Sequence, residues 1–216
     1  MVTGATHFGS ALLLNNAGVK FVMPVPRPSY VPGSFYHFYN RGAHRESIFR
    51  EPDNYLFVIK RIKQVAQEAQ LTVIAYCLLP NHYHFLVRQD SDHRAGLLPQ
   101  RVFNSYSKAY NKRYDHSGTL FESNYHVKLI AHPAHLYHLC RYIHANPVRH
   151  GLVRTVEEWP YSNYLEWVGE RDGTLIDPAF VQEMFGSAEE YRTFVYEYLL
   201  TRQHPDEIQS YMARLD

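Results

Sequence analysis

Two histidines separated by one residue, His82 and His84, have a spacing that suggests metal chemistry. Successive side chains of a β-strand point to opposite faces, so on a strand both imidazoles would face one side and could bind a single metal ion. The spacing alone is weak evidence, because 14 histidines in 216 residues produce such a pair by chance about once. A metal site also needs a third donor from elsewhere in the chain.

The segment before Pro147 offers that donor. His138, Tyr142 and Asn146 are four residues apart, so on a helix they form one stripe. If this stripe lies across the sheet from the histidine pair, the Asn146 amide oxygen can complete the coordination sphere beside the Tyr142 phenol. With 18 tyrosines in the chain, an ordinary core or boundary residue is the commoner situation for Tyr142. His138 is a further candidate ligand or phosphate contact, although a plain surface histidine is the commoner situation.

Hydrophobic patterning predicts the elements that would position these residues. Strands are expected at 35–41, 71–79, 82–88 and 126–130. Helices are expected from Asp53 as N-cap to about Gln70, from Leu97 to Tyr114, and from Pro133 until Pro147 stops it. This order matches the split βαβ, or ferredoxin-like, plan, which is an α+β fold with a four-stranded antiparallel sheet and two helices on one face.

The sequence divides into three parts. Residues 1–34 are expected to be a loosely ordered extension, because four prolines and Gly33 fall within 24–34. Residues 35–165 would form the main domain, and 166–216 an acidic helical tail in which Ser187 and Glu190 make a capping box.

The charge is divided unevenly. Residues 1–150 contain 17 Lys or Arg against 8 Asp or Glu, a net +9, whereas 151–216 contain 5 against 13, a net −8. A basic body is compatible with a polyanionic partner, and equally with two oppositely charged surfaces that dock on each other.

Composition excludes several classes of protein. No window approaches the roughly 18 to 20 apolar residues of a membrane-spanning helix. The first 22 residues lack the pattern of a secretory signal, so the cytoplasm is the expected location. The two cysteines, Cys77 and Cys140, have apolar neighbours and are expected to be buried thiols rather than a disulfide framework or zinc cluster.

Four separated stretches resemble one family when they are taken together. They are FYHFYNRG at 35–42, YCLLPNHYHFLV at 76–87, GTLFE at 118–122 and RYIHANPVRHGLV at 141–153. In this order they resemble the single-tyrosine transposases of the HUH class, and among them the REP-associated tyrosine transposases. The stretch WPYSNY at 159–164 is also similar to that branch. The resemblance covers about residues 35–165, which would then be an HUH transposase domain, and the combination is more specific than any one motif.

The resemblance implies a role for each candidate. His82 and His84 match the HUH pair, with Tyr83 where the family has a bulky apolar residue. Tyr142 matches the nucleophile. Asn146 matches the third metal donor, which is Gln in many relatives and Asn in the REP-associated branch. The implied activity is that of a bacterial, nucleoid-associated transposase or nickase. Such enzymes cut and rejoin single-stranded DNA near hairpins through a covalent 5′-phosphotyrosine.

A divalent cation fits this chemistry. A phenol with a pKa of about 10 is about 4 kcal/mol from its anion at neutral pH, so it needs a neighbour that favours the charged form. Two imidazoles and an amide oxygen with open positions suit Mg²⁺ or Mn²⁺, and the imidazoles favour Mn²⁺ over the harder Mg²⁺. Because a phosphotyrosine conserves the energy of the broken bond, no ATP is required, and the sequence contains no nucleotide-binding glycine loop.

Two groups of residues are candidates for contacts with DNA. On the expected helix 97–114, basic residues alternate with Tyr106, Tyr110 and Tyr114, a combination that single strands use for phosphates and bases. The basic residues are Arg101, Lys108, Lys112 and Arg113. A solvated helix face over an aromatic core would give the same pattern. Asn40 and Arg41 match the family's Asn-Arg-Gly stretch.

Two other functions are compatible with the same residues. One is a domesticated protein that binds nucleic-acid hairpins without cutting them. The complete His, His, Asn, Tyr set and the absence of the aromatic RRM signature speak against it. The other is a histidine-based metallohydrolase that releases a free 5′-phosphate. The sequence is compatible with a monomer and with a homodimer in which the partner chain supplies the tyrosine helix.

Overall fold

The computed structural model describes residues 12–14, 20–22, 28–203, 208–209 and 211. Most of the expected N-terminal extension lies outside these residues. Its described part consists of residues 28–34 and a short antiparallel pair of strands, β1 (Leu12–Leu14) and β2 (Lys20–Val22).

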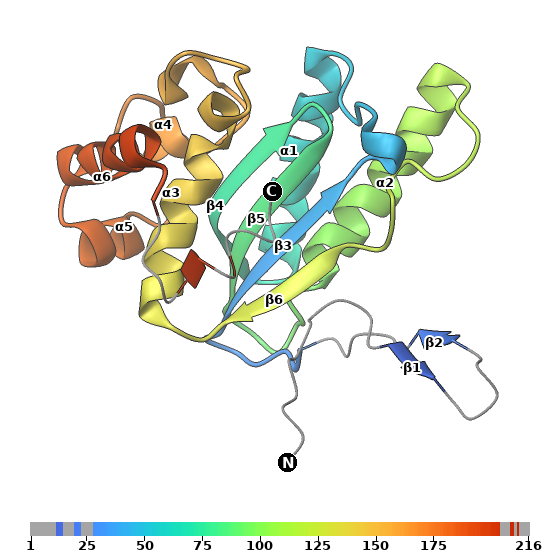
Figure 1. The fold of residues 1–216 in the computed structure, drawn as a ribbon, viewed down its shortest axis with the longest axis horizontal. Coiled ribbons are helices and arrows are strands. Elements are labelled where there is room, and N and C mark those ends of the chain that lie inside the picture. The colour runs from blue at the N-terminus through green and yellow to red at the C-terminus, as the bar shows by residue number, and fades with distance from the viewer. Residues whose placement is uncertain (1–11, 15–19, 23–27, 204–207, 210, 212–216) are drawn as a thin grey trace.

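The main domain is built on a four-stranded antiparallel sheet with the order β4–β5–β3–β6 (Figure 1). The strands are β3 (Phe35–Arg41), β4 (Leu71–Leu79), β5 (His82–Gln89) and β6 (His126–Ile130). Helices α1 (Pro52–Glu68) and α2 (Leu97–Tyr114) cover one face, and α3 (Pro133–Arg149) lies on the other face, beside β4 (Figure 1). The ferredoxin-like α+β expectation is confirmed.

Two helix ends differ from the sequence prediction. Helix α1 begins at Pro52 with Glu51 as N-cap, not Asp53, because a proline in the first position has no N–H to satisfy. Helix α3 continues through Pro147 to Arg149 instead of stopping there. Proline removes one hydrogen bond of the last turn. The His150 N–H still donates to the Asn146 carbonyl at 2.9 Å, so the last turn remains helical despite Pro147.

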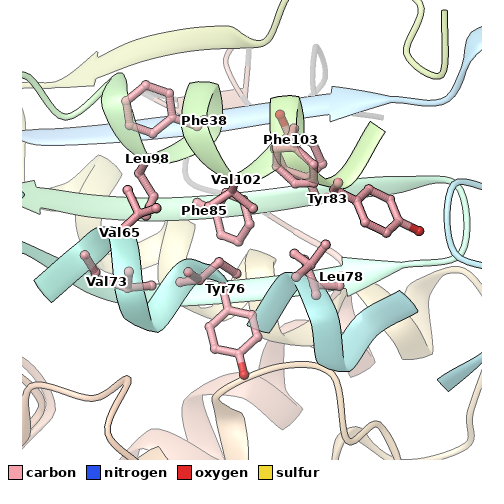
Figure 2. Close-up of a cluster of buried hydrophobic side chains, with 14 of the residues drawn as sticks. Phe38, Val65, Val73, Tyr76, Leu78, Tyr83, Phe85, Leu98, Val102 and Phe103 are labelled. Atoms are coloured by element: carbon pink, nitrogen blue, oxygen red, sulfur yellow. The ribbon is translucent and has the colours of Figure 1, made fainter. Parts of the chain in front are cut away.

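The sheet buries a different core on each face. On one face Val65, Leu98, Val102 and Phe103 pack on the sheet residues Phe38 and Phe85, among others (Figure 2). The Phe103 ring stacks on Tyr83 with 4.0 Å between centroids. Because Tyr83 lies on this face, the residues on either side of it in β5 point to the other face.

The second core joins α3 to the C-terminal helices. These are α4 (Tyr164–Trp167), α5 (Pro178–Phe185) and α6 (Ala188–Thr201), which lie beyond α3 in Figure 1. The Ser187 hydroxyl accepts from the Glu190 N–H at 3.2 Å, so the expected helix start is confirmed. Cys77 and Cys140 are free thiols buried in this core, and burial raises the pKa of both.

A two-residue turn, Pro80 and Asn81, joins β4 to β5. The Pro80 carbonyl accepts from the backbone N–H groups of Ile48 and Phe49, at 2.7 and 3.0 Å. The Asn81 carbonyl accepts from the Gly42 N–H at 2.8 Å. The turn is therefore fixed to the segment that follows β3.

A buried asparagine, Asn163, ties the second core together. Its Oδ1 accepts from the Tyr76 N–H at 2.8 Å and from His144 Nε2 at 2.9 Å. Its Nδ2 donates to the carbonyls of Ile74 and Leu175, at 2.8 and 2.9 Å. One fully buried amide thus links β4, α3 and the segment before α5.

Replacing Asn163 with alanine should strongly destabilise the fold. The substitution leaves several buried donors and acceptors without partners, so we expect the free energy of unfolding to fall by about 3 to 4 kcal/mol. Urea unfolding followed by circular dichroism measures this. Asn104→Ala, at an exposed position on α2, is the control and should change stability by less than about 0.5 kcal/mol. Equal urea midpoints for the two variants would contradict the role of Asn163.

Within the described residues, every helix is too short or too polar to cross a bilayer.

Candidate metal and nucleophile site

Strand β5 places His82 and His84 on the face that α3 borders. In the register with β3, Arg41 is opposite His82 and Tyr39 is opposite His84. The two imidazole rings are 5.4 Å apart and nearly perpendicular. The expectation that the pair shares one face of a strand is therefore confirmed.

A cavity of about 530 Å³ lies over this end of the sheet, and both histidines line it. Its other basic or acidic lining residues are Arg41, Arg45, His126, His150 and Glu122. Glu122 is paired with Arg41, with 3.3 Å between Oε2 and Nε. The excess of basic groups suits an anionic ligand such as a phosphodiester.

Helix α3 brings Tyr142 and Asn146 to the same place. The ring of Tyr142 meets the His84 ring edge-on with 5.6 Å between centroids. Asn146 follows one turn later, and both residues are fully buried. Leu139 and Ile143 of the same helix are buried in the second core, which fixes the rotation of the helix. His82, His84 and Tyr142 thus come together within a single chain, with Asn146 one helical turn from Tyr142.

Two atoms at this site are buried without a hydrogen-bond partner in the described part of the chain. One is His84 Nε2 and the other is Asn146 Oδ1. Their orientation is fixed from the other side: His84 Nδ1 is 3.1 Å from His37 Nε2, and Asn146 Nδ2 donates to the Tyr142 carbonyl at 2.8 Å. Unsatisfied buried polar atoms are costly and rare. A nitrogen and an amide oxygen left in this way fit a metal ion.

His82 can supply the remaining nitrogen. Its Nδ1 is 2.7 Å from Asn81 Oδ1, so we assign Nε2 as the nitrogen that would bind the metal. Among the described residues, no three His, Cys, Asp or Glu side chains are grouped so that they could hold a metal ion. A metal at this site therefore requires the Asn146 amide as well as the two histidines.

Burial keeps the imidazoles next to the site neutral. It lowers the pKa of His84 well below the usual 6.5, and the neighbouring His37, His82, His150 and Arg149 lower it further. Burial, with a smaller contribution from Lys128, lowers the pKa of His37 to about 3. Neutral imidazole is the form that binds metals, so these shifts favour binding at pH 7.

Arg149 places a positive charge next to Tyr142. Its guanidinium carbon is 4.8 Å from the centre of the Tyr142 ring, a cation–π contact. Because the Tyr142 side chain is buried, a ligand would have to displace neighbouring side chains to reach its hydroxyl. Arg149, half-buried at the last turn of α3, is long enough to move and can then pair with a phosphate.

The competing tyrosines and the third member of the stripe lie elsewhere. Tyr137 packs against Phe185 and Phe194, with centroid distances of 4.7 and 4.1 Å. The ring of His138 is 5.5 Å from that of Phe194, on the α6 side of the helix. Tyr125 contacts Phe38 in the core under α1 and α2. Of the residues spaced at four, Tyr142 contacts His84, and Asn146 follows Tyr142 by one helical turn.

Sequence reasoning missed several residues that do reach the site. The ring of Tyr39 is 6.0 Å from that of His84, the ring of His150 is 4.8 Å from that of His82, and His37 bonds to His84. Alternation along β3 could have placed His37 and Tyr39 on the face opposite to the buried Tyr36 and Phe38. The register that sets them beside His84 is not visible in the sequence.

Asn40 and Arg41 both line the cavity. Asn40 is 5% exposed, its Nδ2 donates to the Ser123 carbonyl at 2.9 Å, and its Oδ1 accepts from the Arg41 N–H. Asn40 therefore ties the end of β3 to the segment before β6. The Arg41 side chain can reach a ligand, because it is about one third exposed.

The basic stripe on α2 lies on the opposite face of the sheet from the histidine pair. Tyr106 and Tyr110 are buried, and their hydroxyls donate to the carbonyls of Ile48 and Ser47. The idea that these two rings stack on bases is therefore wrong, and the alternative of an aromatic core under a solvated face holds for them. Arg113 pairs with Glu51 and Asp53, Arg101 is 3.5 Å from Glu68, and Lys108 and Lys112 are exposed.

Comparisons with known proteins identify the family and the fold of the chain. The family model described as "Transposase IS200 like" matches residues 30–146. A Haemophilus influenzae protein named "Putative REP-associated tyrosine transposase" is 29% identical, over 47% of this chain and 64% of that protein, so the match spans less than two thirds of the relative. A solved structure of a REP-associated tyrosine transposase bound to a REP hairpin is 20% identical with a TM-score of 0.55, and covers 72% of this chain and 94% of that one. At 20% identity, the similarity to this solved structure shows the fold alone.

Proposed function

The chain belongs to the IS200-like transposase family, and from this premise we propose that it is a metal-dependent endonuclease and strand transferase for single-stranded DNA. The observation that carries the proposal is the contact of the His84 ring with Tyr142, together with two buried atoms, His84 Nε2 and Asn146 Oδ1, that have no hydrogen-bond partner among the described residues. Buried polar atoms without a partner are costly in a structural core, whereas a metal ion would satisfy both of these atoms.

In the proposed reaction, Tyr142 Oη attacks the phosphorus of a phosphodiester. A bond forms between Oη and phosphorus while the bond from phosphorus to the 3′ oxygen breaks in line. The phenol proton is transferred overall to the leaving 3′ oxygen. The products are a 5′-phosphotyrosine and a free 3′-hydroxyl, which can attack the phosphotyrosine in the reverse sense to rejoin a strand.

Three side chains would hold the metal ion: His82 and His84 through Nε2 and Asn146 through Oδ1. A bound Mg²⁺ or Mn²⁺ would polarise a non-bridging phosphate oxygen and stabilise the charge of the transition state. Around it Arg41, Arg45 and His150 would bind neighbouring phosphates of the strand. His84 remains neutral by burial and is therefore suited to metal rather than to proton transfer.

The proposed partner is single-stranded DNA with a REP-like hairpin, since a relative of the same fold is described as bound to a REP hairpin. Asn40 would act on the DNA indirectly, by fixing Arg41 at the rim of the cavity.

The proposed contribution of α2 to DNA binding is smaller. Its exposed basic residues are Arg101, Lys108, Lys112 and Arg113. They lie away from the cavity, so they can contact only a distant part of a hairpin.

The proposal is tested with a labelled single strand that contains a hairpin. In the presence of Mn²⁺ we expect a labelled band that migrates with the protein on a denaturing gel, and peptide mapping should assign the modified residue as Tyr142. EDTA should abolish the band. Cleavage that yields only a free 5′-phosphate would replace the proposal with a metallohydrolase. Binding without cleavage in Mg²⁺ or Mn²⁺ would indicate a hairpin-binding protein instead.

A further inference from the structure

A row of three side chains leads away from the metal site into the protein. His84 Nδ1 is 3.1 Å from His37 Nε2, and His37 Nδ1 is 2.6 Å from the hydroxyl of Tyr211. The two imidazoles come from neighbouring strands, β5 and β3 (Figure 1), and stack with 5.3 Å between centroids. Tyr211 lies in the last described part of the chain, 127 positions after His84.

 In sequence, Tyr211 and His37 are 174 positions apart.

The protons in this row follow from the proposed role of His84. If His84 Nε2 binds the metal, the ring proton of neutral His84 is on Nδ1, which then donates to His37 Nε2. His37 Nε2 is then an acceptor, so the proton of neutral His37 is on Nδ1 and is donated to the Tyr211 oxygen. Each bond thus fixes the direction of the next.

We propose that His37 is a positioning residue that holds His84 in the tautomer whose Nε2 can bind a divalent metal, and that Tyr211 in turn orients His37. The inference rests on the proposed function, because it takes His84 Nε2 as the metal donor. His37 itself touches neither metal nor DNA in this scheme. It acts through His84 alone.

Burial makes His37 hard to replace in this role. His37 is 0% exposed, His84 1% and Tyr211 4%. Water cannot readily take the place of a missing side chain in such surroundings, so removing the acceptor would leave the His84 Nδ1–H group without a partner. The ring would then be free to move its proton to Nε2, the tautomer that cannot bind the metal. Loss of a hydrogen-bond partner of this kind behind a metal-binding histidine commonly weakens metal affinity by about 10- to 100-fold.

Two substitutions separate the proposed role from simple packing. His37→Phe keeps a planar ring but has no acceptor for His84 Nδ1–H. His37→Gln is less similar in shape but can offer its amide oxygen. We expect His37→Phe to weaken Mn²⁺ binding by about 10- to 100-fold and His37→Gln to restore most of the affinity, as measured by calorimetry on folded protein. Tyr211→Phe, which removes the second link, should have an intermediate effect.

Nuclear magnetic resonance of ¹⁵N-histidine reads the tautomer directly, in the full chain without metal. The unchanged protein should show His84 protonated at Nδ1, and His37→Phe should move the proton largely to Nε2. Tyr191→Phe is the matched control, since it removes another buried bond between tyrosine and histidine, 2.5 Å from His144 Nδ1. It should leave the His84 tautomer unchanged.

The outcomes distinguish the inference from the proposed function. An unchanged protein with His84 protonated at Nε2, or a His37→Phe variant with unaltered tautomer and Mn²⁺ affinity, would overturn the role of His37. An unchanged protein that binds no Mn²⁺ would overturn the proposed metal site, and the metal-free spectra would still decide whether His37 sets the tautomer. Loss of affinity in His37→Phe that His37→Gln does not restore would favour a packing role and count against the inference.

Discussion

Tyr142→Phe should abolish the covalent protein–DNA adduct and leave DNA binding intact. The substitution removes only the hydroxyl, so the edge-on contact with His84 and the contact with Arg149 can both persist. Without Oη no bond to phosphorus can form. We expect the rate of strand cleavage to fall at least about 10⁴-fold, as is common when a nucleophile is deleted.

Tyr137→Phe is the control for this experiment, because Tyr137 lies on the same helix but packs against Phe185 and Phe194. Its adduct formation, followed on denaturing gels with labelled hairpin DNA, should equal that of the unchanged protein. An adduct that forms at the normal rate in Tyr142→Phe would rule out this tyrosine as nucleophile. Tyr39, whose ring is 6.0 Å from that of His84, would then be the next to test.

The second large effect is expected for His84→Ala. Like Asn146 Oδ1, its Nε2 is a candidate metal ligand that is buried without a hydrogen-bond partner among the described residues, and the site offers few other ligands. Removing it should weaken Mn²⁺ binding and lower metal-stimulated cleavage by roughly 10³-fold or more, since several kcal/mol of charge stabilisation are lost. Calorimetry with Mn²⁺ and single-turnover cleavage assays measure the two effects.

His138→Ala is the matched control for the metal site. The sequence offers His138 as a further ligand, but its ring lies 5.5 Å from that of Phe194, on the α6 side of the helix. The variant should bind Mn²⁺ and cleave DNA as the unchanged protein does. Cleavage by His84→Ala at the normal rate, or cleavage of the unchanged protein in the presence of EDTA, would contradict the proposed metal site.

The fold could be predicted largely because its signals are local. The alternation in β5 and the four-residue spacing in α3 need only the period of the element in which they occur. The predicted helix ends are wrong where two local rules compete. Pro147 is an interior helix breaker by itself, but in the last turn it removes only one hydrogen bond, and α3 continues to Arg149.

The site was less predictable because it depends on pairing between distant strands. His82, His84, Tyr142 and Asn146 could be named from spacing and family resemblance. His37 could not, since its contact with His84 exists only in the register that sets β3 against β5. The tyrosines on α2 show the opposite problem. Tyr106 and Tyr110 alternate with basic residues in the sequence, but both rings are buried in the core.

The short turn at Pro80 and Asn81 limits how this chain can change in length. One residue inserted there would shift the register of β5 against β4 by a single position, if the turn kept its two-residue length. The imidazoles of His82 and His84 would then rotate into the core beneath α1 and α2, while Tyr83 would turn outward. Insertions and deletions at this hairpin should therefore be eliminated during evolution, and reporter domains or affinity tags should be fused elsewhere.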